Sequence, residues 1–128
     1  MPDLIGFIQA RLADDEEAAR EASSTDWYLA QPASCGCCLQ IRARDGYGSL
    51  VCTLDDRDAA HVVRHDPARV LREVEAKRKI IARYQASLDY DNAEDEARCW
   101  LLGEIVGVLA SAWSDHPDYD PGWATAAG

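Results

Sequence analysis

The sequence lacks the features of a membrane or exported protein. It has no apolar run near the roughly 18 to 20 residues that cross a bilayer. Its first residues do not follow the basic-then-apolar order of a secretory signal peptide. Five cysteines, an odd number, then favour reduced thiols or metal ligands over a disulfide framework. We expect a cytoplasmic protein with no membrane segment and no structural disulfide.

Familiar catalytic motifs are also missing. The chain contains no G-x-S-x-G elbow, P-loop, dinucleotide fingerprint or zinc-deaminase pattern. Glu104 is a charge within an apolar stretch, but Gly103 and Gly107 beside it indicate close helix contact or a surface edge rather than a perturbed acid. A small hydrolase built on His65 and Asp66 would need a pocket, so the sequence gives no support for an enzyme.

Positive charge is scarce. With 13 basic and 23 acidic residues the formal net charge is -10, and the average field repels phosphate. We therefore expect no direct nucleic-acid binding. Excess acid is a common route to solubility, and a surface that mimics DNA is the alternative.

What is present suits an ordinary folded domain. The chain has 128 residues, 48% hydrophobic and 28% charged, which is enough for one core. The end, "DHPDYDPGWATAAG", is rich in proline, glycine and small residues. We expect a single α+β domain over residues 1–114 and an irregular C-terminal tail over residues 115–128.

Helical periodicity appears in three long stretches. The first covers residues 3–22 behind Asp3 as N-cap. The second has Asp66 as N-cap and Pro67 as first helical residue, and runs to about Leu88. The third starts at Asn92. The apolar stripe expected on the second is Val70, Leu71, Val74, Ile81, Tyr84 and Leu88, and on the third Ala97, Leu101, Ile105, Val108, Leu109 and Ala112.

Residues 38–54 predict a β-hairpin. Two runs of β-type residues flank "DGYG" at 45–48, a strong turn signal. Residues 27–31 are the candidate third strand, and residues 55–64 predict a short helix. In a tight hairpin, alternation places Leu39, Ile41 and Ala43 on one face with Leu50, Cys52 and Leu54.

These elements predict an α+β fold that is mostly helical. An N-terminal helix comes first, then a small antiparallel hairpin or three-stranded sheet, then two long antiparallel helices.

Two groups of side chains suit a metal ion such as zinc. Cys35, Cys37 and Cys38 form a C-x-C-C cluster, and His61 and His65 are separated by one helical turn. A structural zinc site usually has two cysteine knuckles, and the second is missing here. Packing or a redox-sensitive loop is the alternative role of the cysteines.

The two histidines have a plain alternative as well. They can mark a helix boundary, with Asp66 as hydrogen-bond partner of His65. Arg64 adds a cation where a metal dication would have to bind. We expect His61 and His65 to flank a helix start rather than to catalyse a reaction.

Quoted blocks of the chain resemble a known family. They are "DLIGFIQARLADDEEAAR", "HVVRHDPARVLREVEAKRKII" and "CWLLGEIVGVLASAWSDHPDYDPGW". Together they are similar to small uncharacterised proteins of actinobacteria and their phages, a domain of unknown function, over most of the chain. The resemblance implies no activity, substrate or cofactor. Relatives carry a cysteine- and histidine-rich insert between the last two helices, where this chain retains only Cys99.

The functional expectation is protein–protein interaction. A small acidic protein of phage or mobile-element type would act by binding a host protein or another copy of itself, as a homodimer, with Trp113, Tyr119 and Trp123 as anchors. The alternative is a zinc-binding regulatory domain that uses the Cys35–Cys38 cluster with a histidine.

Overall fold

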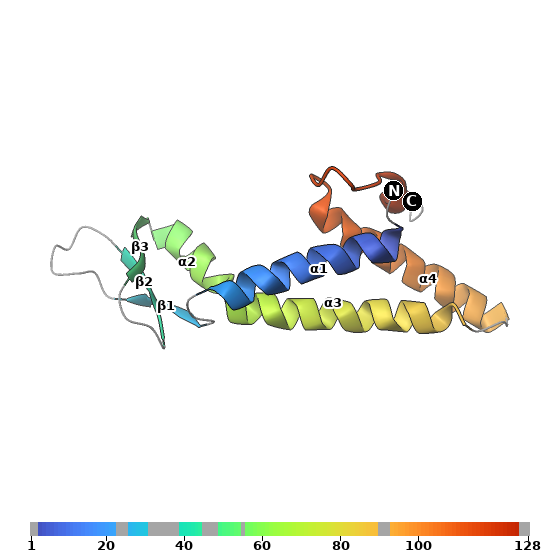
Figure 1. Ribbon diagram of the computed structural model, residues 1–128, viewed down its shortest axis with the longest axis horizontal. Coiled ribbons are helices and arrows are strands. Elements are labelled where there is room, and N and C mark those ends of the chain that lie inside the picture. The colour runs from blue at the N-terminus through green and yellow to red at the C-terminus, as the bar shows by residue number, and fades with distance from the viewer. Residues whose placement is uncertain are drawn as a thin grey trace. The chain divides into compact units, whose positions relative to one another are not determined.

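A computed structural model describes residues 3–22, 26–30, 39–44, 49–54, 56–89 and 93–125. In chain order its elements are α1 (Leu4–Glu21), β1 (Trp27–Ala30), β2 (Leu39–Ala43), β3 (Ser49–Leu54), α2 (Asp56–Arg64), α3 (Pro67–Ser87), α4 (Ala93–Ala110), the 3-10 helix η1 (Ser111–Trp113) and α5 (Gly122–Thr125). The fold is α+β and mostly helical, as the sequence predicts (Figure 1).

The chain divides into two compact units. One comprises residues 1–14 and 74–128, and the other residues 15–73. Each has buried apolar residues of its own, among them Phe7 and Val106 in the first and Ile41 and Ala59 in the second. The single domain over residues 1–114 stays a prediction. The tail predicted to be irregular includes the short helix α5 and belongs to the first unit.

Aspartate caps start two of the helices. The Gly6 N–H donates to Asp3 Oδ1 over 2.6 Å, and the Arg69 N–H donates to Asp66 Oδ1 over 2.9 Å. Each bond satisfies an amide that has no partner within its helix. Pro67 follows as the first residue of α3, where its missing N–H costs nothing. Both predicted caps are confirmed, and α3 is one continuous helix.

The second unit holds a three-stranded antiparallel sheet in the order β1-β2-β3. The predicted third strand is β1, which pairs Leu29 with Ile41 and Trp27 with Ala43. Helix α2 contacts all three strands (Figure 1). Its Ala59 is fully buried. The small alanine allows the helix to approach the sheet closely.

The predicted hairpin register is correct for Leu39 and Leu54, which lie opposite each other, and wrong for the residues nearer the turn. Ile41 lies opposite Val51, and Gln40 lies opposite Cys52, so Cys52 does not share the register face of Ile41. The pairing shifts between Leu39 and Gln40 and again between Ile41 and Arg42. Such irregularities change which residues face each other, and strict alternation from the turn does not capture them. The predicted turn at residues 45–48 lies outside the described residues.

The first unit is built from helices. Phe7, Ile8 and Leu12 of α1 are buried, as are Val74 and Ile81 of α3. The apolar stripe predicted on α3 is thus buried at its middle positions, while Val70 and Leu71 are half-buried in the other unit. The prediction that Leu88 belongs to this stripe is wrong, because Leu88 follows the last residue of α3 and is exposed.

Candidate protein-interaction site

Helix α4 presents large apolar side chains to solvent. Trp100 is 64% exposed, Leu101 52%, Ile105 40% and Val108 56%. The spacing of residues 101, 105 and 108 places them along one side of a helix, with Trp100 beside them. We call these four residues the α4 outer face.

The opposite side of α4 packs inside the unit. Val106 and Ala110 are fully buried. A Cβ added at Gly103 would lie 3.4 Å from the Tyr84 ring, and one added at Gly107 would lie 2.5 Å from the Trp123 carbonyl oxygen. The missing side chain at Gly107 therefore permits close approach of the tail, and Gly103 faces Tyr84 of α3, so this side of α4 is the inner one.

The apolar stripe predicted to be buried on α4 is wrong. Leu101, Ile105 and Val108 belonged to it and are exposed, as are Ala97 and Ala112. Apolar residues occur around most of the circumference of this helix, so their periodicity does not select a face. Gly103 and Gly107 were the signal that identifies the inner side.

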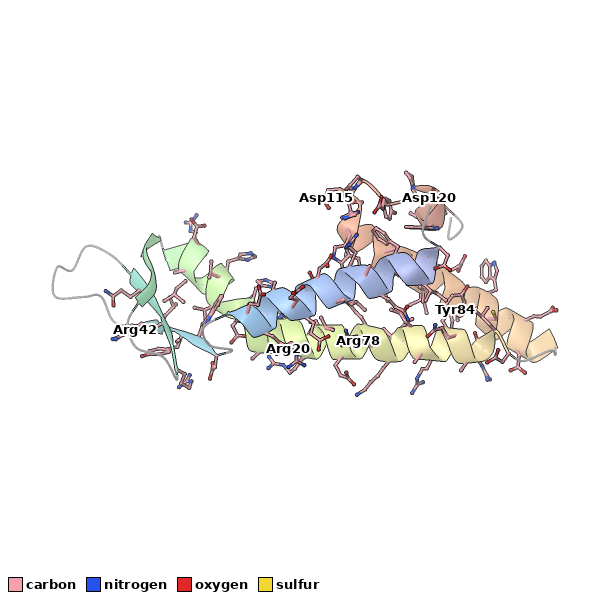
Figure 2. All side chains as sticks on the ribbon, in the orientation of Figure 1. Arg20, Arg42, Arg78, Tyr84, Asp115 and Asp120 are labelled. Atoms are coloured by element: carbon pink, nitrogen blue, oxygen red, sulfur yellow. The ribbon has the colours of Figure 1, made fainter. Side chains whose placement is uncertain are left out.

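A hollow of about 290 Å³ adjoins the outer face. Its lining is mostly aromatic or apolar and joins α1, α3, α4 and α5: Leu4, Tyr84, Cys99, Trp100, Gly103, Glu104, Gly122 and Trp123. Tyr84 projects from α3 toward α4 (Figure 2). Glu104 is the charged residue of this lining, and its position in the sequence is one turn from both Trp100 and Val108. An apolar hollow with one carboxylate suits an apolar group that carries a cation.

The tail is anchored on the buried ring of Phe7. That ring lies 5.0 Å from the ring of Trp123, 5.6 Å from that of His116 and 6.1 Å from that of Tyr119, measured between centroids. Arg11 Nη1 also lies 2.7 Å from His116 Nε2, at hydrogen-bond distance. Aromatic contacts of this kind stabilise beyond their buried area. The start of α1 therefore holds the C-terminal segment in place.

The predicted partner anchors are half-buried. Tyr119 and Trp123 contact Phe7 and each other, with their own rings 5.6 Å apart. The Lys77 ammonium lies 5.2 Å from the centre of the Trp113 ring. These rings therefore have partners within the chain, while Trp100, which the sequence reasoning did not select, is the most exposed tryptophan described. Binding of a partner by Trp113, Tyr119 and Trp123 stays a prediction.

The predicted metal ligands are only partly described. His61 and His65 lie together at the end of α2, with ring centroids 4.5 Å apart. Cys35, Cys37 and Cys38 lie outside the described residues. Among the residues that the structure describes, no three histidine, cysteine, aspartate or glutamate side chains gather as a metal-binding group. Zinc binding stays a prediction.

Comparisons with known proteins identify a family. The model of a family of unknown function, DUF6221, matches residues 1–125. No curated protein and no solved structure matches the chain. Within the described helices, none combines the length and apolar character that spanning a membrane requires.

Proposed function

We propose that this chain, which belongs to the DUF6221 family of unknown function, acts by binding a basic amphipathic segment of a partner protein on the α4 outer face. The observation that carries the proposal is the exposure of four large apolar side chains along one side of a helix. A helix face of this kind is a common docking surface for a second amphipathic helix.

The size of the surface supports this reading. The exposed parts of Trp100, Leu101, Ile105 and Val108 amount to an apolar area on the order of 400 Å², within the range of patches that serve as interaction sites. Trp100 has the largest exposed area on this face that a partner can bury, and tryptophan is enriched among residues that dominate binding energy. We expect Trp100 to be the main anchor.

The charge of the surface indicates the partner's chemistry. Glu104 lies among the apolar residues of α4, and the helix carries the acids Glu94, Asp95, Glu96 and Glu104 against one base, Arg98. The whole chain has a net charge of -10. A partner that covers this face stabilises the complex when it supplies lysine or arginine to Glu104, because an unpaired carboxylate is costly to bury.

The same carboxylate disfavours a homodimer. Two copies that joined through their α4 outer faces would bring two Glu104 carboxylates into one apolar interface, where each α4 supplies four acids and one base. Like charges at an interface cost free energy. We therefore favour a different protein over a second copy.

The biological setting belongs to the same proposal. We infer an accessory protein of a phage or mobile element whose partner is a host protein in the cytoplasm. The resemblance to actinobacterial and phage proteins motivates this setting, and the odd cysteine count agrees with a reducing compartment.

A peptide pair tests the proposed chemistry. Two amphipathic helical peptides with the same leucine pattern, one with lysine and one with glutamate on the polar face, are titrated into the full chain by calorimetry. We expect the lysine peptide to bind at least about 10-fold more tightly, with an affinity that falls as salt rises. Equal binding of the two peptides would contradict the proposal.

Matched variants locate the binding surface. Trp100→Ala should weaken binding of the lysine peptide by about 2 kcal/mol, which is roughly a 30-fold loss of affinity. Glu104→Gln should reduce the preference for lysine over glutamate. Leu29→Ser is the control, because Leu29 is also exposed but lies on β1. A loss with Leu29→Ser equal to that with Trp100→Ala, or a concentration-dependent dimer that Trp100→Ala abolishes, would overturn the assignment.

A further inference from the structure

His61 and His65 form an exposed pair of imidazoles at the end of α2. His61 lies within α2 and His65 directly follows it, and both residues are exposed. Their ring centroids are 4.5 Å apart and the ring planes are inclined by 47°. This geometry holds the two rings beside each other without stacking them face to face.

We propose that these two imidazoles chelate one divalent transition-metal ion, with water in the remaining positions. Imidazole nitrogen is a suitable ligand for zinc, nickel and copper ions. His61 lies in the last turn of α2, and His65 directly follows it with its N–H bonded to that turn, so one short backbone segment presents both ligands. The site is independent of the α4 outer face, so either proposal can fail without the other.

The separation of the rings fits a shared ion. A ring nitrogen lies about 1.1 Å from its ring centroid and about 2.0–2.1 Å from a bound ion, which places the ion roughly 3.2 Å from each centroid. Two such rings have centroids about 4.5 Å apart when the ligand angle is near 90°, and about 5.2 Å apart at a tetrahedral angle. The observed 4.5 Å lies at the first of these values.

Helix capping does not account for the pair. The Asp66 carboxylate accepts the Arg69 N–H over 2.9 Å and lies 3.5 Å from the Trp27 amide nitrogen. It is therefore engaged with backbone groups and not with His65. Because both histidines are exposed, their rings also do not fill the core. The fold leaves the two imidazoles available for a ligand.

Arg64 does not block the site. It is exposed, and its carbonyl oxygen accepts a hydrogen bond from Arg69 Nη1 over 3.3 Å. Its position in α2 directs it to the flank of the side that carries the histidines. Water screens an exposed cation at that position, so we expect Arg64 to weaken binding without preventing it.

Nickel titration of the full chain tests the proposal. The tag-free protein is titrated with Ni²⁺ alone by calorimetry, with Mg²⁺ as the contrast. We expect one Ni²⁺ per chain and no Mg²⁺ binding, because magnesium prefers oxygen ligands. His61→Ala and His65→Ala should each weaken Ni²⁺ binding about 10-fold or more, since either change turns a chelate into a single contact. Unchanged affinity in either variant would overturn the proposal.

A relocation variant keeps the composition and removes the geometry. The double change Ala60→His with His61→Ala moves one imidazole by one position on α2, where Ala60 is also exposed. The two histidines are then five residues apart and on different sides of the helix. We expect Ni²⁺ affinity to fall to the level of His61→Ala. Retained affinity would show that the helix geometry is not responsible.

A cysteine variant tests the source of the remaining ligands. Serine replaces Cys35, Cys37 and Cys38 together. We expect unchanged Ni²⁺ affinity from a site made by two histidines and water. A loss of about 10-fold or more would overturn that site in favour of one completed by thiolates.

Discussion

Two alanine substitutions on α4 test which side of this helix faces inward. Gly103 and Gly107 are one turn apart, so replacing either by alanine brings the same gain in helix propensity, about 1 kcal/mol. Their surroundings differ. The new Cβ at Gly103 would lie 3.4 Å from the Tyr84 ring, whereas that at Gly107 would lie 2.5 Å from the Trp123 carbonyl oxygen.

The expected magnitudes follow from these distances. A separation of 3.4 Å is an ordinary contact, so Gly103→Ala should raise the free energy of unfolding by up to about 1 kcal/mol. At 2.5 Å the backbone of α5 must move, and overpacking of this kind costs about 1–3 kcal/mol. We expect Gly107→Ala to be less stable than Gly103→Ala by about 1–3 kcal/mol.

Urea denaturation of the two variants and the parent chain measures this difference. Comparing the variants with each other cancels the propensity gain, so the remainder reports the contact with the tail. At about 4 °C per kcal/mol, thermal unfolding should separate them by roughly 4–12 °C. Equal stability of the two variants would refute the close approach of Trp123 to α4, and with it the assignment of the inner side.

Two further predictions concern the ends of the helices. Phe7→Ala should lower the free energy of unfolding by about 3–5 kcal/mol in urea denaturation, because it removes a buried ring that contacts His116, Tyr119 and Trp123. A loss of less than about 1 kcal/mol would show that the tail is not anchored on Phe7. Asp66→Ala should cost about 1 kcal/mol through the lost cap of α3. Asp66→Asn should keep most of that stability, since asparagine caps as well, and equal losses in the two variants would assign the effect to charge instead.

Local signals in the sequence predicted the helix starts and the fold class. Asp3 and Asp66 accept backbone N–H groups from residues three positions later, a contact within one turn that sequence spacing defines. Pro67 marks the start of α3 for an equally local reason. Glu75 and Lys79, which are one turn apart on α3, also form an ion pair over 3.7 Å.

Tertiary contacts determined what the sequence reasoning missed. The buried side of α4 depends on which neighbours approach Gly103 and Gly107, and the residues concerned, Tyr84 and Trp123, are distant in sequence. The apolar pattern of α4 does not contain that information, because both sides of the helix are apolar.

The sequence favoured an interaction protein, which stays a prediction, and it did not locate the surface proposed for that role. Composition and the missing catalytic motifs favoured an interaction protein, and the aromatic tail drew attention to Trp113, Tyr119 and Trp123. The tail folds back onto Phe7 and leaves Trp100 as the exposed ring. The spacing of His61 and His65 did place two imidazoles together, because that relation is local to one turn.

The exposed apolar side of α4 has a consequence for handling the protein. Copies that each carry a charge of -10 repel one another at low ionic strength, which keeps their exposed apolar surfaces apart. Physiological salt shortens that repulsion to about 8 Å, and strongly hydrated anions such as sulfate promote burial of apolar area. Concentrated stocks should therefore stay clear in dilute buffer and turn turbid in ammonium sulfate, with Trp100 among the first residues to be shielded from water.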